Sequence, residues 1–538
     1  MYYNYTYNKE GLLESKSTCG KTLLKYTYDK NNNIKTIKDI TGKSSIYNYD
    51  DANRVTLITD GKAKKQAEYD YYSNDKIKSV ILGNGIKSDY TYDGDGNVES
   101  LVTVTADGQI LVDYNYAYDL NGNRLQKVSN KHKSFYSYDS MNRLVDSSYD
   151  GRQESFTYDK VGNRLTKTTN DITEKYIYNV KNQLKEIQSE DSKSVFIYDK
   201  QGNTLQEQTT SGNKTFEYNT LNQQVKAIAK EGNTLVNRYD TEGLRYEIEE
   251  NEKLARFIFN KNGDILVETD SDDNVVSRFT RGHKVVSADI SGERSYYSVD
   301  EQGSTEFISD SFGNIRNEYW YDAFGNVLDS KEDVHNRITY TGQQFDKITQ
   351  QYYLRARFYN PVVGRFTQED VYRGDGLNLY AYCGNNPVGY CDPSGYSSIN
   401  KERSFNLEDY NKKSNSPYDI LREKGIKTTF DDVDREVLDS GNWRMMGKGD
   451  NNLKPDPRAY GKPHSTFKKD PVTGKTTNYE TYAVNENVPK TGLVREKRYD
   501  GTGGTHMNKV TKQYVDTPHV HDKNTPGDIR KPDPDEIP

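Results

Sequence analysis

A tyrosine followed by aspartate or asparagine recurs through the first half of this 538-residue chain at a nearly constant spacing. Successive tyrosines lie 20 or 21 residues from one another, except for one interval of 23 and one of 26. Self-similarity at a fixed period is the signature of a repeat architecture, in which one small unit is stacked many times. The repeated positions are Tyr7, Tyr28, Tyr49, Tyr69, Tyr92, Tyr118, Tyr138, Tyr158, Tyr178, Tyr198, Tyr218 and Tyr239.

Each repeat has the pattern of a strand, a turn and a second strand. Phe156 and Tyr158 share one face of an extended chain, and Asp159 then opens a turn. Gly162 and the asparagine after it tolerate the positive φ that tight turns require. Longer turns of this form alternate with shorter ones such as 139–142, which suggests a structural unit made of two repeats.

The composition favours a sheet and excludes several other classes of protein. No proline precedes Pro361, and proline is avoided inside sheet ladders. Apolar residues make up only 33%, but 46 tyrosines can cover a sheet, because the ring is buried while the hydroxyl finds a polar partner. So many aromatic residues argue against disorder. Three cysteines without a CxxC spacing exclude a disulfide scaffold and a zinc ribbon, and no apolar run approaches the ~20 residues of a membrane span.

Charge and proline content both change near residue 396. Residues 1–396 carry a net charge of −9, whereas residues 397–538 carry +2, and the stretch 441–512 within them carries +7. Eleven of the 14 prolines and four of the seven histidines lie beyond Tyr396. These shifts indicate that two different kinds of domain share the chain.

The repeats closely resemble the YD (RHS) repeat family, through motifs such as YDLNGNRL at Tyr118 and YDKVGNRL at Tyr158. The resemblance implies a mainly β fold, in which YD repeats over 1–339 form an antiparallel β-sheet that spirals into a shell around the C-terminal part of the chain. A plain β-solenoid or propeller is the alternative, although those folds have other signatures. Met1 falls inside a repeat, without a cap or secretion signal, so we expect a partial, N-terminally incomplete shell. It is either a fragment of a longer secreted or cell-surface bacterial protein or the product of a remnant gene that begins within the shell.

Residues 340–396 resemble the RHS-associated core segment of that family. In many relatives this segment is an intramolecular aspartyl protease whose two aspartates stand 22 positions apart. The resemblance therefore implies catalytic roles for Asp370 and Asp392 and scission after Tyr396, although Val371 stands where the family often has proline. The matching pieces are YLRARFY from Tyr353, GRF from Gly364, LNLY from Leu377, NNP from Asn385 and DPSG from Asp392.

Paired carboxyl groups suit peptide hydrolysis, because two neighbouring acids do not ionise together easily and one keeps its proton. The ionised group activates a water molecule, while the protonated group polarises the scissile carbonyl. The alternative is structural: residues 392–395 form a turn, and Asp370 caps a loop. Cys383 and Cys391 are expected to be packed thiols.

Residues 397–538 have the pattern of a small α+β domain. Helices are predicted between Pro417 and Gly425 and from Thr429, followed by a hairpin over 464–484 and a strand over 494–499. The family places a variable toxin at this position. The tail resembles a polymorphic toxin domain of type 24, through GKPH from Gly461, YETY from Tyr479, RYDGTG from Arg498, NKV from Asn508 and PHVH from Pro518.

The residues of the tail suggest nuclease chemistry, because a small basic domain is attracted to phosphates. RNA cleavage without a metal needs a base, an acid and a cation. His519 and His521 share one face of an extended chain, and with His506 or His464 they could instead hold a divalent metal ion; no other cofactor is expected. The alternative is ordinary surface histidines. The candidates for base and acid are His464, His506, His519 and His521, and those for the cation are Arg498 and Lys509.

Two functions remain open from the sequence. The first is a polymorphic toxin of interbacterial competition, whose shell carries a nuclease-like toxin that autoproteolysis releases, with RNA favoured over DNA as the target. It implies a cognate immunity protein, acidic if it masks the basic face, and action in the cytoplasm of the target cell. The second is a non-enzymatic cell-surface protein whose tyrosine-rich sheet binds carbohydrate or partner proteins.

Overall fold

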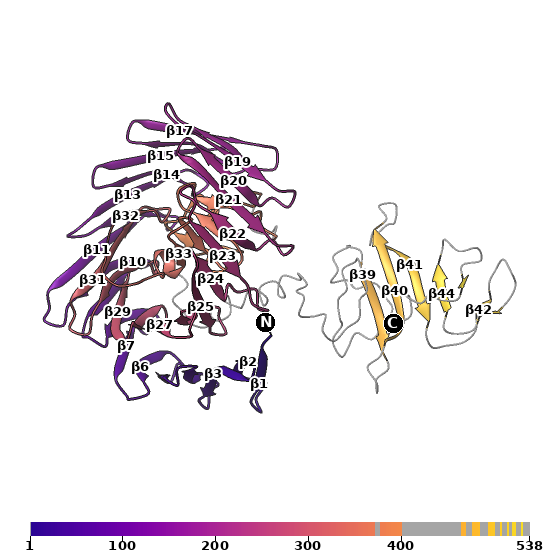
Figure 1. Cartoon of the computed structure of the whole chain (residues 1–538), viewed down its shortest axis with the longest axis horizontal. Coiled ribbons are helices and arrows are strands. Elements are labelled where there is room, and N and C mark those ends of the chain that lie inside the picture. The colour runs from indigo at the N-terminus through magenta and orange to yellow at the C-terminus, as the bar shows by residue number, and fades with distance from the viewer. Residues whose placement is uncertain are drawn as a thin grey trace. The chain divides into compact units, whose positions relative to one another are not determined.

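The computed structural model describes residues 2–371 and 377–400, and beyond them only short strands of the tail (Figure 1). The chain divides into two compact units, Met1–Lys427 and Thr428–Pro538. Among the described residues almost all regular structure is β, which confirms the predicted fold class. The predicted helices at 417–425 and from Thr429 lie outside the described residues.

The first unit is built on one antiparallel sheet of 32 strands. Each strand pairs with its neighbours in the sequence, so the sheet grows one hairpin at a time; β15 with β16 and β16 with β17 are examples. The first sixteen strands are β1 Asn4–Tyr7, β2 Leu13–Thr18, β3 Lys21–Tyr28, β4 Ile34–Asp39, β5 Ser44–Tyr49, β6 Val55–Asp60, β7 Lys65–Tyr71, β8 Ile77–Leu82, β9 Lys87–Tyr92, β10 Val98–Val104, β11 Ile110–Tyr118, β12 Arg124–Val128, β13 Lys133–Tyr138, β14 Leu144–Tyr149, β15 Arg152–Tyr158 and β16 Arg164–Thr169. The other sixteen are β17 Ile172–Tyr178, β18 Leu184–Gln188, β19 Lys193–Tyr198, β20 Thr204–Thr209, β21 Gly212–Tyr218, β22 Gln224–Ile228, β23 Thr234–Arg238, β24 Glu247–Glu250, β25 Lys253–Phe259, β26 Ile265–Thr269, β27 Val275–Arg281, β28 Val285–Ile290, β29 Glu293–Val299, β30 Thr305–Ser309, β31 Ile315–Tyr321 and β32 Val327–Glu332.

The aspartate of each repeat closes the turn after its strand. Asp159 Oδ1 accepts hydrogen bonds from the backbone N–H groups of Val161 and Asn163 at 3.0 and 2.8 Å, and Gly162 adopts φ +84°. In the turn after Tyr138, which appears shorter in the sequence, Asn142 occupies the position of the glycine and has φ +60°. Both forms close the same five-residue turn, so the expected unit of two alternating repeats is wrong: the unit is one repeat.

The tyrosine of most repeats attaches its hairpin to the previous one. The Tyr158 hydroxyl donates to the backbone carbonyl of Leu144 at 2.8 Å, and the Tyr178 hydroxyl donates to that of Arg164 at 2.9 Å. A tyrosine whose ring is buried needs such a partner for its hydroxyl, which explains why tyrosine and not phenylalanine recurs. The same bond is made by Tyr28, Tyr49, Tyr92, Tyr118, Tyr138, Tyr239 and Tyr321, and in the fourth repeat by Tyr71, so the predicted position Tyr69 is wrong by two residues.

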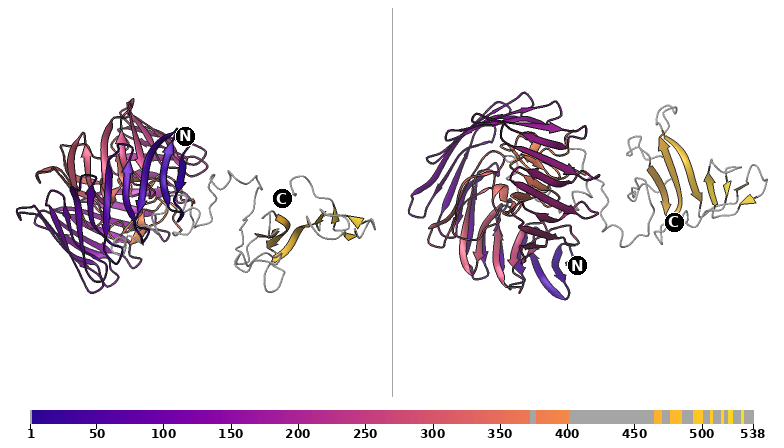
Figure 2. Two further views of the ribbon diagram at one scale, coloured as in Figure 1. Left: turned by 90° about the horizontal axis from the view of Figure 1, so that it is seen from below. Right: turned by 45° about the horizontal axis from the view of Figure 1, so that its top comes forward.

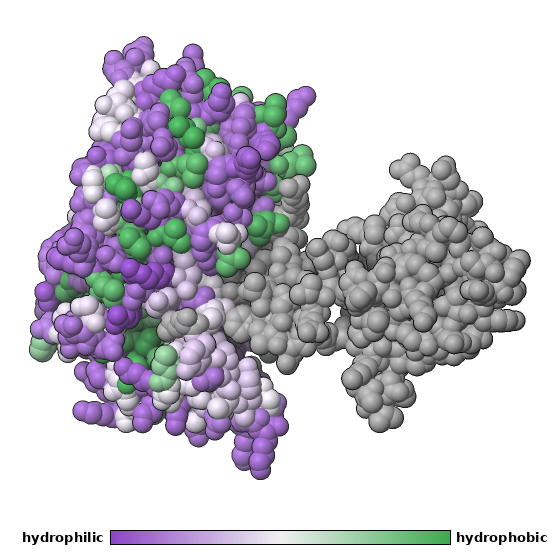
Figure 3. All heavy atoms as spheres, turned by 45° about the vertical axis from the view of Figure 1, so that its right-hand side comes forward, coloured by the Kyte–Doolittle hydropathy of each residue, from purple (hydrophilic) through white to green (hydrophobic). Residues whose placement is uncertain are grey.

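The sheet curls until its first strands meet hairpins that follow much later in the chain (Figure 2). Tyr3 donates to Asp240 at 3.0 Å across 237 positions, and Lys43 pairs with Asp289 at 2.9 Å across 246 positions. One apolar cluster joins Ile58 of the early strands to Val267 and Phe307 of the later ones. The visible outer face of the shell is mainly hydrophilic, with apolar side chains interspersed (Figure 3).

The segment after the sheet packs against the wall of the curled sheet and forms a small core of its own (Figure 1). The buried tyrosines Tyr352 and Tyr359 donate to the carbonyls of Gly325 and Phe324 at 2.8 and 2.7 Å. This segment contains a 3₁₀ turn η1 Tyr340–Gly342, strands β33 Gln344–Asp346, β34 Gln351–Tyr353, β35 Phe358–Asn360 and β36 Arg365–Phe366, a second 3₁₀ turn η2 Cys383–Asn385, and the pair β37 Tyr390–Cys391 and β38 Ile399–Asn400. Cys383 and Cys391 are buried and form no disulfide, in line with their expected role as packed thiols.

The tail strands form a five-stranded antiparallel sheet and a separate pair. The hairpin expected over 464–484 and the strand expected over 494–499 are both present. The sheet has the order β39 His464–Lys469, β40 Thr476–Val484, β41 Leu493–Asp500, β44 His519–Asp522 and β45 Ile529–Arg530, and the pair is β42 His506–Met507 with β43 Tyr514–Val515.

Candidate active site

Asp370 and Asp392 are brought together in the core segment although 22 positions separate them. Asp370 follows β36, and its backbone N–H donates to the carbonyl of Leu379 at 3.0 Å. Asp392 follows β37 directly. Their exposed fractions are only 6% and 2%, so both carboxyl groups are held away from solvent.

The Arg357 guanidinium links the two carboxyl groups. Its Nη2 lies 2.8 Å from Asp370 Oδ2 and 3.6 Å from Asp392 Oδ2, and all three side chains are buried. The guanidinium packs 3.6 Å from the centre of the Phe366 ring, which keeps it in place. A buried cation between two acids offsets their mutual repulsion, so the pair can stay close.

Asp392 also closes the turn that leads to the predicted scission point. Its Oδ1 accepts hydrogen bonds from the N–H groups of Ser394 and Gly395 at 3.1 and 2.8 Å. Oδ2 of the same carboxyl group faces Arg357. The structural interpretation of the DPSG motif and the catalytic one are therefore compatible, because each uses a different oxygen.

The predicted scissile bond between Tyr396 and Ser397 lies in the loop of a hairpin. β37 and β38 flank this loop and pair in register, with Tyr390 opposite Asn400. The Gly395 carbonyl accepts a hydrogen bond from Arg357 Nε, and Tyr396 is 8% exposed. The residues before the bond are thus fixed beside the two acids. Arg357 stands inside the YLRARFY motif that begins at Tyr353, but no local signal predicts its contact with the two acids.

The strand register places several tail candidates in one sheet. Arg498 is paired with Glu480 on one side and with His521 on the other, so these three residues form one row across β40, β41 and β44. His519 is paired with Asp500, two positions further along the same strands. His464 begins β39 at the sheet edge. Glu480 was not predicted from the sequence, since only the register connects it to Arg498.

Two predicted tail candidates are not part of this sheet. His506 begins β42, which pairs only with β43 in a separate ladder. Lys509 lies outside the described residues. Within the part of the chain that the structure describes, no cluster of three or more His, Cys, Asp or Glu side chains has the arrangement of a metal site. No helix in that same part has the length and apolar character that crossing a bilayer requires.

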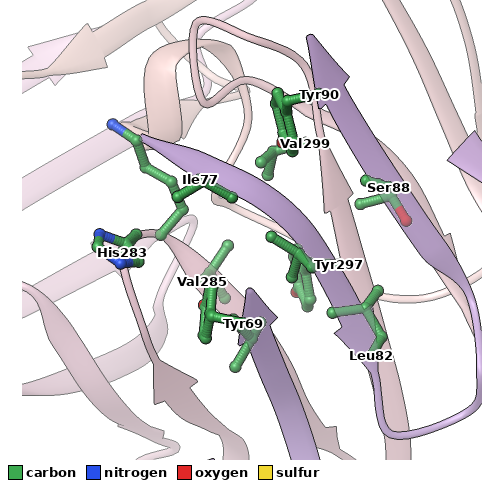
Figure 4. A pocket seen from close by; sticks show the side chains of 13 residues that line it. Tyr69, Ile77, Leu82, Ser88, Tyr90, His283, Val285, Tyr297 and Val299 are labelled. Atoms are coloured by element: carbon green, nitrogen blue, oxygen red, sulfur yellow. The ribbon is translucent and has the colours of Figure 1, made fainter. Parts of the chain in front are cut away.

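A small cavity of about 40 Å³ lies between β8–β9 and β28–β29 (Figure 4). Tyr69, Leu82, Val285 and Tyr297 line it, together with His283 at one end. This volume holds about one water molecule and no substrate. The cavity is therefore a packing feature of the shell.

A spiral antiparallel sheet of tyrosine–aspartate hairpins that carries its own core segment defines a YD-repeat shell protein. The family model described as Teneurin YD-shell matches residues 3–113 and 107–388, and the chain belongs to this family. The fold agrees with a Photorhabdus luminescens Tc holotoxin pore structure, with a TM-score of 0.55 and 18% identity, over 74% of this chain and 22% of that one. A TcdB2-TccC3 structure without its hypervariable C-terminal region gives a TM-score of 0.54 and 16% identity, over 72% of this chain and 23% of that one.

Curated relatives are similar over shorter stretches. The tRNA3(Ser)-specific nuclease WapA of Bacillus spizizenii is 35% identical over 184 residues, which is 32% of this chain and 8% of that protein. The double-stranded DNA deaminase toxin A of Burkholderia cenocepacia is 30% identical over 129 residues, which is 23% of this chain and 9% of that protein. The chain thus spans less than a tenth of the length of these two relatives.

Proposed function

We propose that this chain is the shell and cargo of a polymorphic toxin used in interbacterial competition. In this proposal the shell cuts its own chain after Tyr396 and releases residues 397–538 as a nuclease-like toxin. The observation that carries it is the meeting of Asp370 and Asp392 at Arg357 beside the DPSG loop. A purely structural ion pair would need only one acid beside Arg357. Here two acids face the same cation, next to the loop at which members of the family are cleaved.

The proposed scission is a hydrolysis. One carboxylate of the pair takes a proton from a water molecule, whose oxygen adds to the carbonyl carbon of Tyr396. The C–N bond to Ser397 then breaks, and the leaving nitrogen takes a proton from the other carboxyl group. Arg357 contributes by holding both acids and the Gly395 carbonyl, which fixes the attack geometry.

The released tail is proposed to cleave RNA rather than DNA, by general base and acid catalysis. The proposal is supported by the strand register, in which Arg498 and His521 are opposite each other and His519 lies two positions away on β44. Glu480 in the same row provides a further base. The name of the Bacillus relative, a tRNA nuclease, supports nucleic acid as the target class. A cognate immunity protein would protect the producing cell, and we propose that the protein acts after secretion or from the cell surface.

Scission is tested on the purified full-length chain by intact mass, which is 61.8 kDa before cutting. The parent should yield a fragment that begins at Ser397. Asp392→Asn and Asp370→Asn should each stop this, because either change breaks the acid pair. Asp329→Asn removes an exposed carboxylate from β32 and should cut like the parent. A chain that stays at full mass without any substitution would show that the pair is inactive.

Toxicity is tested by expressing 397–538 in bacteria with and without the gene that follows it. His521→Ala and Glu480→Gln should each lower the cleavage rate by at least ~10²-fold, because a base–acid pair loses most of its rate when one member is removed. Each substitution should therefore relieve the growth arrest. His506→Ala, in the separate ladder, is the matched control. A divalent-metal chelator separates the two chemistries, since loss of activity would indicate a metal held by the histidines.

The second hypothesis, a surface protein that binds carbohydrate through its tyrosines, receives no support from the geometry. Eight of the repeated tyrosine hydroxyls, and those of Tyr71 and Tyr321 at equivalent positions, donate to the preceding hairpin. Growth arrest by the isolated tail would separate the two hypotheses, because a binding protein needs no toxic tail.

A further inference from the structure

Arg355 connects the scission loop to the wall of the shell. On the wall side, its Nη2 lies 3.0 Å from Asp264 Oδ1, and its Nε donates to the Gly263 carbonyl at 3.2 Å. On the loop side, its Nη1 donates to the carbonyl of Pro393. Arg355 adopts φ +64°, in the left-handed region that non-glycine residues rarely occupy. Its guanidinium is fixed between two parts of the chain by its contacts on both sides.

Three successive residues hold three successive carbonyls of the loop. Arg355 binds the carbonyl of Pro393, the Ala356 N–H donates to that of Ser394 at 3.1 Å, and Arg357 Nε donates to that of Gly395. A Cβ at Gly395 would lie only 2.6 Å from the Leu354 carbonyl oxygen, so the loop is pressed closely against this segment. Residues 393–395, just before the predicted scissile bond, are therefore each held by a hydrogen bond to their carbonyl group.

Asp264, the wall partner of Arg355, belongs to a turn whose sequence differs from most turns of the shell. Most turns begin with aspartate, and many have asparagine four positions later. The turn between β25 and β26 begins instead with Asn260 and ends with Asp264. This reversal puts a carboxylate where Arg355 reaches it, while the bond within the turn is kept, because Asn260 Nδ2 donates to Asp264 Oδ2 at 3.2 Å. The turns with the usual order end at Asn33, Asn97, Asn123, Asn163, Asn203, Asn274, Asn314 and Asn326.

We propose that Arg355 is a positioning residue for the scission, and that Asp264 is the wall contact that orients it. The inference rests on the proposed autoproteolysis at Asp370 and Asp392. Because Asp264 belongs to the shell wall, the loop reaches its cutting geometry only when the β25–β26 turn has docked on it. Scission therefore follows closure of this part of the shell, and an incompletely folded chain keeps its toxin attached.

Two substitutions separate positioning from folding. Asp264→Asn installs the residue that many other turns have at this place, so the turn itself is preserved. Arg355→Lys keeps the positive charge but loses the forked geometry that binds Asp264 and Pro393 together. Each should slow the appearance of the Ser397 fragment by about 10- to 100-fold, the usual effect of a small misplacement of reacting groups. The thermal unfolding midpoint should not change.

The matched control is Arg365→Lys. Arg365 is also a buried arginine of the core segment that donates to a wall carbonyl, that of Asn182 at 2.7 Å, but it does not contact residues 393–395. The Arg365→Lys chain should release the Ser397 fragment at the parental rate. The pH profile of scission should keep its shape in Asp264→Asn and Arg355→Lys, because neither residue belongs to the acid pair.

Hydrogen exchange gives a readout that a purely structural role would not produce. In the uncut Asp370→Asn chain, adding Asp264→Asn should speed exchange of the amides at 394–396 and leave β33–β36 unchanged. Parental scission rates in both variants would overturn the inference, and so would slower scission with a lower midpoint or faster exchange throughout β33–β36. Failure of the proposed function is recognised separately: the parent with Asp264 and Arg355 intact would then stay at full mass, or the Asp370→Asn chain would be cut like the parent.

Discussion

Arg245 of the shell wall and Asp346 of the core segment form an ion pair that is completely withdrawn from solvent. Arg245 Nη1 lies at 2.5 Å from Asp346 Oδ2 and Nη2 at 3.0 Å from Oδ1, and the side chains are 0% and 1% exposed. Asn237 and Gln344 accept further hydrogen bonds from the same guanidinium. Such a pair contributes little net stability compared with apolar residues, but it fixes one register between wall and segment.

Removing one partner of this pair should destabilise the shell strongly. Asp346→Ala leaves the Arg245 charge buried without its counterion, which typically costs about 3–5 kcal/mol. We expect a corresponding fall in the free energy of unfolding in urea, together with proteolytic release of the segment after β32. Asp329→Ala, at an exposed position of β32, should change stability by less than about 0.5 kcal/mol. Equal effects of the two substitutions would contradict the buried role of Asp346.

The tyrosine hydroxyls should each stabilise the stack of hairpins by a measurable amount. Tyr158→Phe keeps the buried ring and removes only the bond to the Leu144 carbonyl, so we expect a loss of about 1 kcal/mol. Tyr7 occupies the same position of the repeat, but its side chain is exposed, and Tyr7→Phe should be neutral. Urea denaturation of both variants checks this. No difference between them would mean that the recurrence of tyrosine has another cause.

Glu306 should make the shell less stable as the pH rises. Burial raises the pKa of Glu306 from 4.5 to about 7, against the opposing effect of Lys127. The folded state therefore holds this proton more tightly than the unfolded state, so the contribution is complete below pH 4.5 and is lost as the pH rises through 7. Glu306→Gln should flatten this dependence and gain up to about 3 kcal/mol over the parent at pH 8. Urea midpoints at pH 5 and 8 give the comparison; an unchanged slope would count against it.

The sequence predicted the hairpins well because their signals are local. Asp159 and Gly162 determine a turn by themselves, so the period of the repeat gives the strands directly. The partner of each tyrosine hydroxyl could not be predicted, because the carbonyl of Leu144 lies 14 positions away and has no side-chain signal. The curling of the sheet, which brings Tyr3 to Asp240, depends on the accumulated twist of many strands and leaves no local pattern.

The candidate site was predicted only in part, for the same reason. The spacing of Asp370 and Asp392 carries the family motif, and the structure brings the two together even though Val371 replaces the expected proline. Arg357 and Arg355 lie within the YLRARFY motif, but no local pattern indicates their roles. The contacts that define those roles join segments that lie far apart in the sequence. In the tail, the pairing of Arg498 with His521 follows from strand order, which alternation alone does not predict.

His283 should give the shell a pH dependence of the opposite sign to that of Glu306. Burial lowers the pKa of His283 from 6.5 to about 4, and the Tyr71 hydroxyl lies 2.8 Å from its Nε2. The folded state holds this ring neutral, whereas the unfolded chain takes up a proton below pH 6.5, so stability falls as the pH drops from 6.5 towards 4.

His283→Gln removes the titrating ring and keeps a hydrogen-bonding side chain beside Tyr71. The variant should lose less stability than the parent between pH 7 and 4.5, by roughly 2 kcal/mol, while its stability at pH 7 is slightly lower because the glutamine fits the cavity less well. Ser88→Ala changes the lining of the same cavity without removing a titrating group, so it is the control and should keep the pH dependence of the parent. Urea midpoints measured across this pH range decide the matter: if His283→Gln and the parent fall together, the acid sensitivity of the shell comes from other groups.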